Sequence, residues 1–171
     1  MYDARVIANE VLKAAWENGH DVTQIDLQKI CYFLHGHHLV DHGQPMIAST
    51  FEAWDYGPVQ RSLYNQFKKF GSQSITELAV AFDPIRQKEK PLPSVTTNSI
   101  RETIAKHLPK YLSIPSFELV EMTHQPDTPW SKTRSDAINS ANIGMRISND
   151  LIVDLFEGLH CSEEAMFAKS A

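Results

Sequence analysis

The residues best suited to chemistry in this sequence are four histidines that lie close together, His35, His37, His38 and His42. His35, His38 and His42 are spaced so that one face of a helix could present all three imidazoles to Zn²⁺. No HExxH motif accompanies them, and no carboxylate stands where it would complete the ligand set. The alternative is that His35 and His38 are buried and hydrogen-bonded, while His37 and His42 are solvated. We therefore predict no metal, and keep a metal-dependent hydrolase using His35, His38 and His42 as an alternative.

A second candidate is the thiol of Cys31, which precedes His35 by one helical turn. Such a pair could in principle form an activated thiolate. Cys31 lies within an apolar run, however, which is typical of an inert core residue. Cys161 is the other cysteine, and no CxxC pair exists, so both are predicted to be reduced thiols. Phosphate-binding GxxxxGK[ST] and GxGxxG motifs are absent. No catalytic residue and no cofactor are predicted.

Large aromatic side chains beside prolines form the third group. Trp54 and Tyr56 come just before Pro58, and Trp130 follows Pro129. Aromatic residues in turns are favourable contacts at protein interfaces. The alternative is that these rings cap the core beneath the turns.

Two polar positions accompany these aromatic residues. His124 is expected to fix the turn before Trp130 through a hydrogen bond to the backbone, not to act as a base. Arg61 forms a small basic edge with Lys68 and Lys69. A helix-turn-helix contact with DNA is conceivable there, but the turn residues give it no support. The formal net charge of -5 also argues against a phosphate-binding surface.

A buried helix from about Thr23 to Asp41 is expected to position these groups. Thr23 and Asp26 resemble a capping box at its start, and His42-Gly43 is its stop. Apolar side chains lie nearly all round this helix, which predicts that it is central in the fold.

The remaining elements follow from hydrophobic periodicity and turn residues. Further helices are predicted at 2–17, 58–70, 94–108, 113–123 and 148–158, with Pro58 in a first turn and Pro109 as a stop. Less regular predictions are a strand over 49–54, a short helix over 75–82, an exposed loop over 84–93, a rigid turn over 123–130, and a short helix or irregular segment over 135–142.

The predicted fold class is mostly α, with α+β at the margin. We expect a compact bundle of six to seven helices around a central buried helix, with one or two short strands. Residues 1–160 are predicted to form a single domain, and 161–171 a flexible C-terminal tail.

Composition bounds the location and the partners. The chain has 171 residues, 42% of them hydrophobic, with 16 Lys+Arg against 21 Asp+Glu. No basic leader with an apolar core opens it, and no apolar run approaches the roughly 20 residues that span a bilayer. A cytoplasmic protein without a membrane partner is expected, and its mild acidity suits a basic protein partner.

Three spaced segments resemble the Panacea domain, the SocA-like antitoxin family that includes GepA-type phage-associated proteins. The first is Leu27-Gln28-Lys29-Ile30-x-Tyr32-Phe33-x-His35-Gly36. The second is Phe51-Glu52-Ala53-Trp54-x-Tyr56-Gly57-Pro58-Val59 with Leu63-Tyr64-x-x-Phe67-Lys68, and the third is Thr123-His124-x-x-x-x-Pro129-Trp130. The resemblance extends over about residues 5 to 157. His37 and His38 depart from it, because aromatic residues are common there in the family.

The resemblance implies a protein that is not an enzyme. It is expected to be an antitoxin of a type II-like toxin–antitoxin system that neutralises a cognate protein toxin by direct binding. The alternative implied by one branch of the family is an adaptor that delivers its toxin to a cytosolic AAA+ protease. The residues predicted to bind the toxin are the turn aromatics and their neighbours: Trp54, Tyr56, Pro58, Arg61, His124 and Trp130. Neither the oligomeric state nor the chemistry of the toxin follows from the sequence.

Overall fold

The computed structural model describes residues 1–139, 145–154 and 156. These residues form six α-helices, a short 3-10 helix and a helical stretch at 149–154. The helices are α1 (Ala4–Glu17), α2 (Gln24–His42), α3 (Arg61–Phe67), η1 (Lys68–Phe70), α4 (Asn98–Leu112), α5 (Ser116–His124) and α6 (Pro129–Asn139). The mostly α fold class predicted from the sequence is confirmed. The predicted tail at 161–171, with Cys161, lies outside the described residues.

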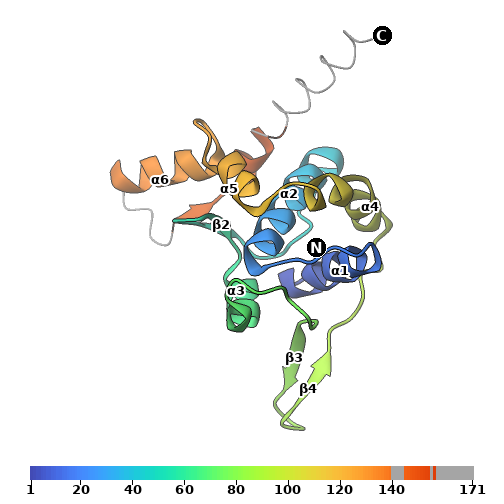
Figure 1. The fold of residues 1–171 in the computed structure, drawn as a ribbon. Helices are drawn as coiled ribbons and strands as arrows, with labels where there is room; N and C mark the ends of the chain where they lie inside the picture. The colour runs from blue at the N-terminus through green and yellow to red at the C-terminus, as the bar shows by residue number, and fades with distance from the viewer. Residues whose placement is uncertain (140–144, 155, 157–171) are drawn as a thin grey trace, which may run out of the picture.

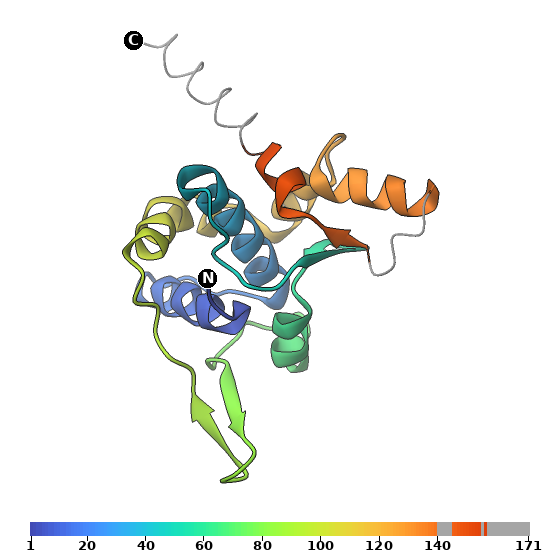
Figure 2. The same cartoon turned by 180° about the vertical axis from the view of Figure 1, so that it is seen from behind.

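Helix α2 is the central element, as its apolar pattern predicts. All thirteen residues from Leu27 to Leu39 are buried, and α1, α3, α4, α5 and strand β2 (Gly57–Val59) all contact it. Figures 1 and 2 show α2 enclosed by these elements. Thr23 and Asp26 form a capping box at its start, and Gly43 ends it in the left-handed conformation.

Gly36 on α2 permits a close approach by the C-terminal segment. A Cβ atom at this position would lie 2.3 Å from Cζ of Phe156, so only glycine leaves room for that ring. Phe156 itself is fully buried and contacts the rings of Tyr32 and Phe33. The His35-Gly36 pair in the first segment therefore has a packing explanation.

A small antiparallel sheet lies beside α2. Its order is β2–β1–β5, with β1 at Phe51–Trp54 and β5 at Arg146–Ile147. Trp54 pairs with Gly57 and Ala53 with Pro58, so residues 51–59 form a tight hairpin. The sequence predicted β1 but placed Pro58 in the first turn of a helix. That placement is wrong, because Pro58 belongs to β2 and the helix begins at Arg61.

A second hairpin projects from the body of the molecule in both views (Figures 1 and 2). It consists of β3 (Val80–Asp83) and β4 (Lys88–Pro91), which pair only with each other in the described sheets. The short helix predicted over 75–82 is wrong, and the predicted exposed loop contains β4. The physical reason is that Asn9 of α1 holds the backbone of Ala79 through two hydrogen bonds of 2.8 and 2.9 Å, which leads the chain into β3.

Two proline positions also differ from the sequence predictions. Pro109 does not end α4, which continues to Leu112 because Tyr111 is buried and its ring stacks on Phe33 at 4.8 Å. Pro129 begins helix α6, with Thr128 accepting a hydrogen bond from the backbone of Ser131. The rigid turn predicted over 123–130 is therefore the junction between α5 and α6. Short strands are also more numerous than the one or two expected.

No described helix is both long and apolar enough to cross a bilayer.

Candidate functional site

The β1–β2 hairpin, residues 51–59, is where the separate sequence segments meet. Helix α2 holds it through two consecutive polar side chains. Gln28 accepts a hydrogen bond from the backbone N–H of Gln60 at 2.7 Å and donates one to its carbonyl at 3.1 Å. Lys29 donates to the carbonyl of Pro58 at 3.1 Å. Gln28 and Lys29 thus fix the return strand of the hairpin and the start of α3.

Gly57 allows the hairpin to lie this close to its supports. Its φ is +95°, a conformation that favours glycine. A Cβ atom there would lie 2.6 Å from Oγ1 of Thr123 and 2.7 Å from Nζ of Lys29. Any side chain at position 57 would therefore force Thr123 and Lys29 to shift, and with them the contacts that hold the hairpin.

The junction between α5 and α6 holds the other strand. Nε1 of Trp130 donates to the carbonyl of Trp54 at 2.7 Å. The ring of His124 lies 3.8 Å from that of Trp130, and its two nitrogens face the carbonyls of Val120 and Asp55 at 2.7 and 3.0 Å. His124 and Trp130 therefore position the turn of the hairpin from behind.

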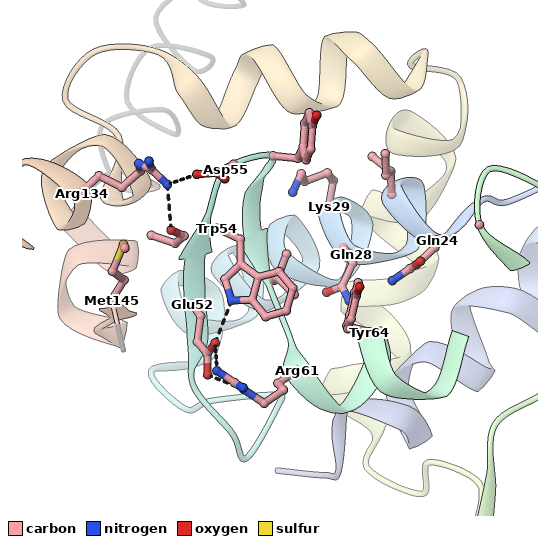
Figure 3. A pocket seen from close by; sticks show the side chains of 15 residues that line it. Gln24, Gln28, Lys29, Glu52, Trp54, Asp55, Arg61, Tyr64, Arg134 and Met145 are labelled. Carbon is pink, nitrogen blue, oxygen red and sulfur yellow. Dashed lines mark hydrogen bonds and ion pairs between the residues drawn. The ribbon is translucent and has the colours of Figure 1, made fainter. Parts of the chain in front are cut away.

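A pocket of about 680 Å³ opens beside the hairpin (Figure 3). Trp54 lies among the labelled side chains of its wall, with Glu52 and Arg61 on one side and Tyr64 on the other. The ring of Tyr64 is 4.9 Å from that of Trp54, and the Arg61 guanidinium is 5.8 Å from the same indole. Elements α2, β1, β2, α3 and α6 all contribute to the lining. The wall combines aromatic surface with fixed charges, which is typical of a binding site.

Two ion pairs organise the charges at the rim. Arg61 binds Glu52 through two hydrogen bonds of 2.7 and 3.1 Å, which hold the pKa of the Glu52 carboxyl below its usual value. Glu52 also accepts from Nε1 of Trp54 at 2.8 Å, so this pair sets the orientation of the indole. Arg134 of α6 binds Asp55 at 2.9 Å.

Lys29 has a different electrostatic environment. The residue is 1% exposed, and no described carboxylate forms an ion pair with it. Burial lowers the pKa of its ammonium from 10.5 to about 7. A buried lysine with a strongly shifted pKa in a pocket wall is a candidate functional group.

The structure separates the six predicted binding residues into two sets. Trp54, Tyr56 and Arg61 line the pocket, with Tyr56 72% exposed at the tip of the hairpin. Pro58, which the sequence placed at an exposed edge, is buried. His124 and Trp130 are half-buried supports, as expected if they cap the turn.

The histidines of α2 do not form a metal site in the described structure. The backbone N–H of Ile47 donates to Nδ1 of His35, so Nε2 carries the proton and donates to Asn149. Both nitrogens of His35 are thus engaged. His38 binds the hydroxyl of Thr103 at 2.9 Å, and burial is the main cause that lowers the pKa values of His35 and His38 to about 4. No metal-binding group of three or more ligand residues occurs among the described residues.

The two nearby residues that sequence reasoning set aside also have packing explanations. His37, predicted to be solvated, is buried, with Nε2 at 2.6 Å from the hydroxyl of Tyr111. Cys31 is fully buried, and desolvation raises the pKa of its thiol to about 12. A thiolate nucleophile is therefore disfavoured at this position.

Sequence reasoning missed Lys29, Gln28, Tyr64 and Arg134 as parts of the site. The available signal was a lysine inside a helix that is otherwise apolar nearly all round. Such a cation must either reach solvent or occupy a special environment.

The fold and the site together define a class of protein: a small helical domain that presents an aromatic, charged pocket beside a tightly held hairpin. Residues 27–131 match the family model "Antitoxin SocA-like, Panacea domain", so the chain belongs to this family. It is 30% identical to Antitoxin SocA of Caulobacter vibrioides (strain NA1000 / CB15N) over 154 aligned residues. The alignment covers 90% of this chain and 82% of that protein. No solved structure shows a significant match.

Proposed function

We propose that this protein is an antitoxin that neutralises a cognate protein toxin by direct binding, and that the pocket beside the β1–β2 hairpin is the contact surface. One observation carries the proposal. Of the three segments that carry the family resemblance, the second forms the hairpin and the first and third hold it, and that hairpin presents Trp54 and Tyr56 next to the pocket. Binding without catalysis is the role that this arrangement supports, and a cytoplasmic location fits it.

The chemistry of the surface suits a protein partner. Tyr56 supplies a large exposed ring, and Trp54 a half-buried one whose orientation is fixed by Glu52. Aromatic and arginine side chains contribute most to the free energy of many protein interfaces. Rigid support from α2, α5 and α6 limits the entropy lost when a partner orders these side chains.

The test is co-expression with the product of the adjacent gene, the toxin expected for this family. The wild-type protein should restore growth and co-purify with that product. Tyr56→Ala and Arg61→Glu should each weaken binding by about tenfold or more, because each removes a large contact or reverses a charge at the pocket.

Matched controls are Phe117→Ala and Lys88→Glu. Phe117 is 63% exposed on α5 and Lys88 is exposed on β4, and neither lines the pocket. Both control variants should bind like the wild type. A neighbour that is harmless alone, or one that stays toxic and unbound beside this protein, would refute the proposed function. The half-life of the toxin separates masking from delivery: masking leaves it unchanged, while delivery to an AAA+ protease shortens it.

A further inference from the structure

The side chain of Lys29 is the least expected group in the core. It lies near the start of the buried run of α2, where Ile30, the next residue, and Leu27, two residues before, are also 1% exposed. An ammonium group removed from water without a counter-charge is unfavourable unless something compensates it. The wall of the pocket includes this residue, and Figure 3 shows its nitrogen turned toward the hairpin.

Holding the hairpin does not by itself account for a cation at this position. An ammonium group has three donors, and one of them binds the carbonyl of Pro58. The neighbouring Gln28 holds the backbone of Gln60 through two hydrogen bonds with no charge at all. A neutral donor would therefore serve the same structural purpose as Lys29 at a lower desolvation cost.

The charges around the pocket leave Lys29 as the cation without a described counter-ion. Glu52 and Asp55 are each bound to an arginine, Arg61 and Arg134 respectively. The other titratable groups that line the pocket are Tyr56 at the tip of the hairpin and Tyr64 on α3, while His124 of α5 lies against the carbonyl of Asp55. Among these groups, both carboxylates are already paired with an arginine, so neither is free to pair with the ammonium of Lys29. The pocket thus fits a ligand that carries one negative charge on an otherwise apolar segment.

We propose that Lys29 anchors one acidic side chain, an Asp or Glu of the protein partner, that enters this pocket past Trp54. The inference rests on the proposed function, since the toxin provides the carboxylate. The incoming oxygen would accept from the ammonium donors not used by Pro58, while the aromatic wall covers the aliphatic part of the partner residue. The contact would be sheltered from water, which strengthens a charge-assisted hydrogen bond.

A linked proton provides the signature of this contact. Because the pKa of Lys29 is about 7 in the free protein, most of its amine is neutral at pH 8. A bound carboxylate favours the ammonium form, so complex formation at pH 8 should take up a proton. Affinity should then fall as pH rises above about 7, by up to tenfold per unit until the pKa of the bound state is reached.

The experiment is titration calorimetry of the adjacent gene product with the full-length wild-type protein and with Lys29→Met. Measurements at pH 8 in phosphate and in Tris, whose ionisation enthalpies differ, give the number of protons taken up. The wild type should take up close to one proton per complex, and Lys29→Met should take up at least half a proton less. The variant should also bind at least tenfold more weakly while it stays folded, with cooperative thermal unfolding, because removal of the desolvation cost offsets the lost hydrogen bond to Pro58.

The carboxylate is identified by changing each Asp and Glu of the toxin to its amide. One such change should cause the same loss and add nothing further in the Lys29→Met background. If only removal of the toxin's terminal carboxylate has this effect, the assignment to an acidic side chain is wrong.

The possible outcomes separate this inference from the proposed function. Tight binding of the toxin by Lys29→Met, with unchanged proton uptake, would overturn the inference and leave the proposed function standing. Absence of any binding by the wild type would overturn both. Should Lys29→Met fail to fold, the wild-type proton uptake decides: a value near zero at pH 8 overturns the inference.

Discussion

At the scale of single residues, the site depends on glycines at positions where a Cβ atom would overlap with neighbouring side chains. Gly57 is the clearest of these, because α2 and α5 both contact the space that a Cβ would fill. Gly36 does the same for the ring of Phe156. The hairpin and the C-terminal segment can therefore lie directly against the central helix.

Substitution of Gly57 by alanine tests this account of the hairpin. The change should lower the free energy of unfolding by about 2 to 4 kcal/mol, since it adds backbone strain at positive φ to overlap with Thr123 and Lys29. Gly19→Ala is the matched control. Gly19 has φ +75°, and nothing lies within 4 Å of the place where an alanine methyl group would be, so it isolates the strain, about 1 kcal/mol. Chemical denaturation measures both, and equal losses would contradict the close approach at Gly57.

At the scale of elements, periodicity was sufficient to predict most helices but not the junctions between them. The helices near 2–17 and 23–41 agree with α1 and α2 because amphipathic or fully apolar runs report burial directly. Pro58 was misplaced because a proline suits both a first helical turn and a strand, and Lys29 decides between them by binding its carbonyl.

The candidate site was only partly predictable for the same reason. Sequence reasoning could predict three of the lining residues, Trp54, Tyr56 and Arg61, because large aromatics in turns and a nearby basic residue are typical of contacts with a partner. The pocket also includes Lys29 and Arg134. Both are distant from residues 54–61 in the sequence, so only the tertiary structure shows that they belong to the same site. The sequence pattern predicts a rigid turn at Pro129-Trp130. The same residues also fit a helix start, with Thr128 as the N-cap and Pro129 in the first turn, and α6 begins there.

The β3–β4 hairpin is predicted to be dispensable for the stability of the body. Phe82 and Ile85 on it are 64% and 93% exposed, so its removal uncovers little core. Replacing residues 82–89 by a short Gly-Ser linker should change the thermal unfolding midpoint by no more than a few degrees. The hydrogen bonds of Asn9 to Ala79 remain in such a variant. A large drop in the midpoint, measured by circular dichroism, would show that the hairpin stabilises the fold.

At the scale of the whole molecule, one central helix supports the proposed contact surface at one side. Helix α2 contributes Gln28 and Lys29 to the site and His35, His37 and His38 to the core, so the same element performs both tasks. The conspicuous histidines are packing residues in the described structure. The overall charge of -5 favours attraction to a basic partner at long range, whereas the wall of the pocket includes the amino group of Lys29.

The central claim is that the toxin covers the β1–β2 hairpin and its pocket. Hydrogen–deuterium exchange of the protein, alone and bound to the adjacent gene product, tests it most directly. Binding should slow exchange in peptides that cover residues 54–64, with little change in residues 81–91 of the projecting hairpin. Protection confined to α4 or to residues 81–91, with exchange in 54–64 unchanged, would contradict the claim.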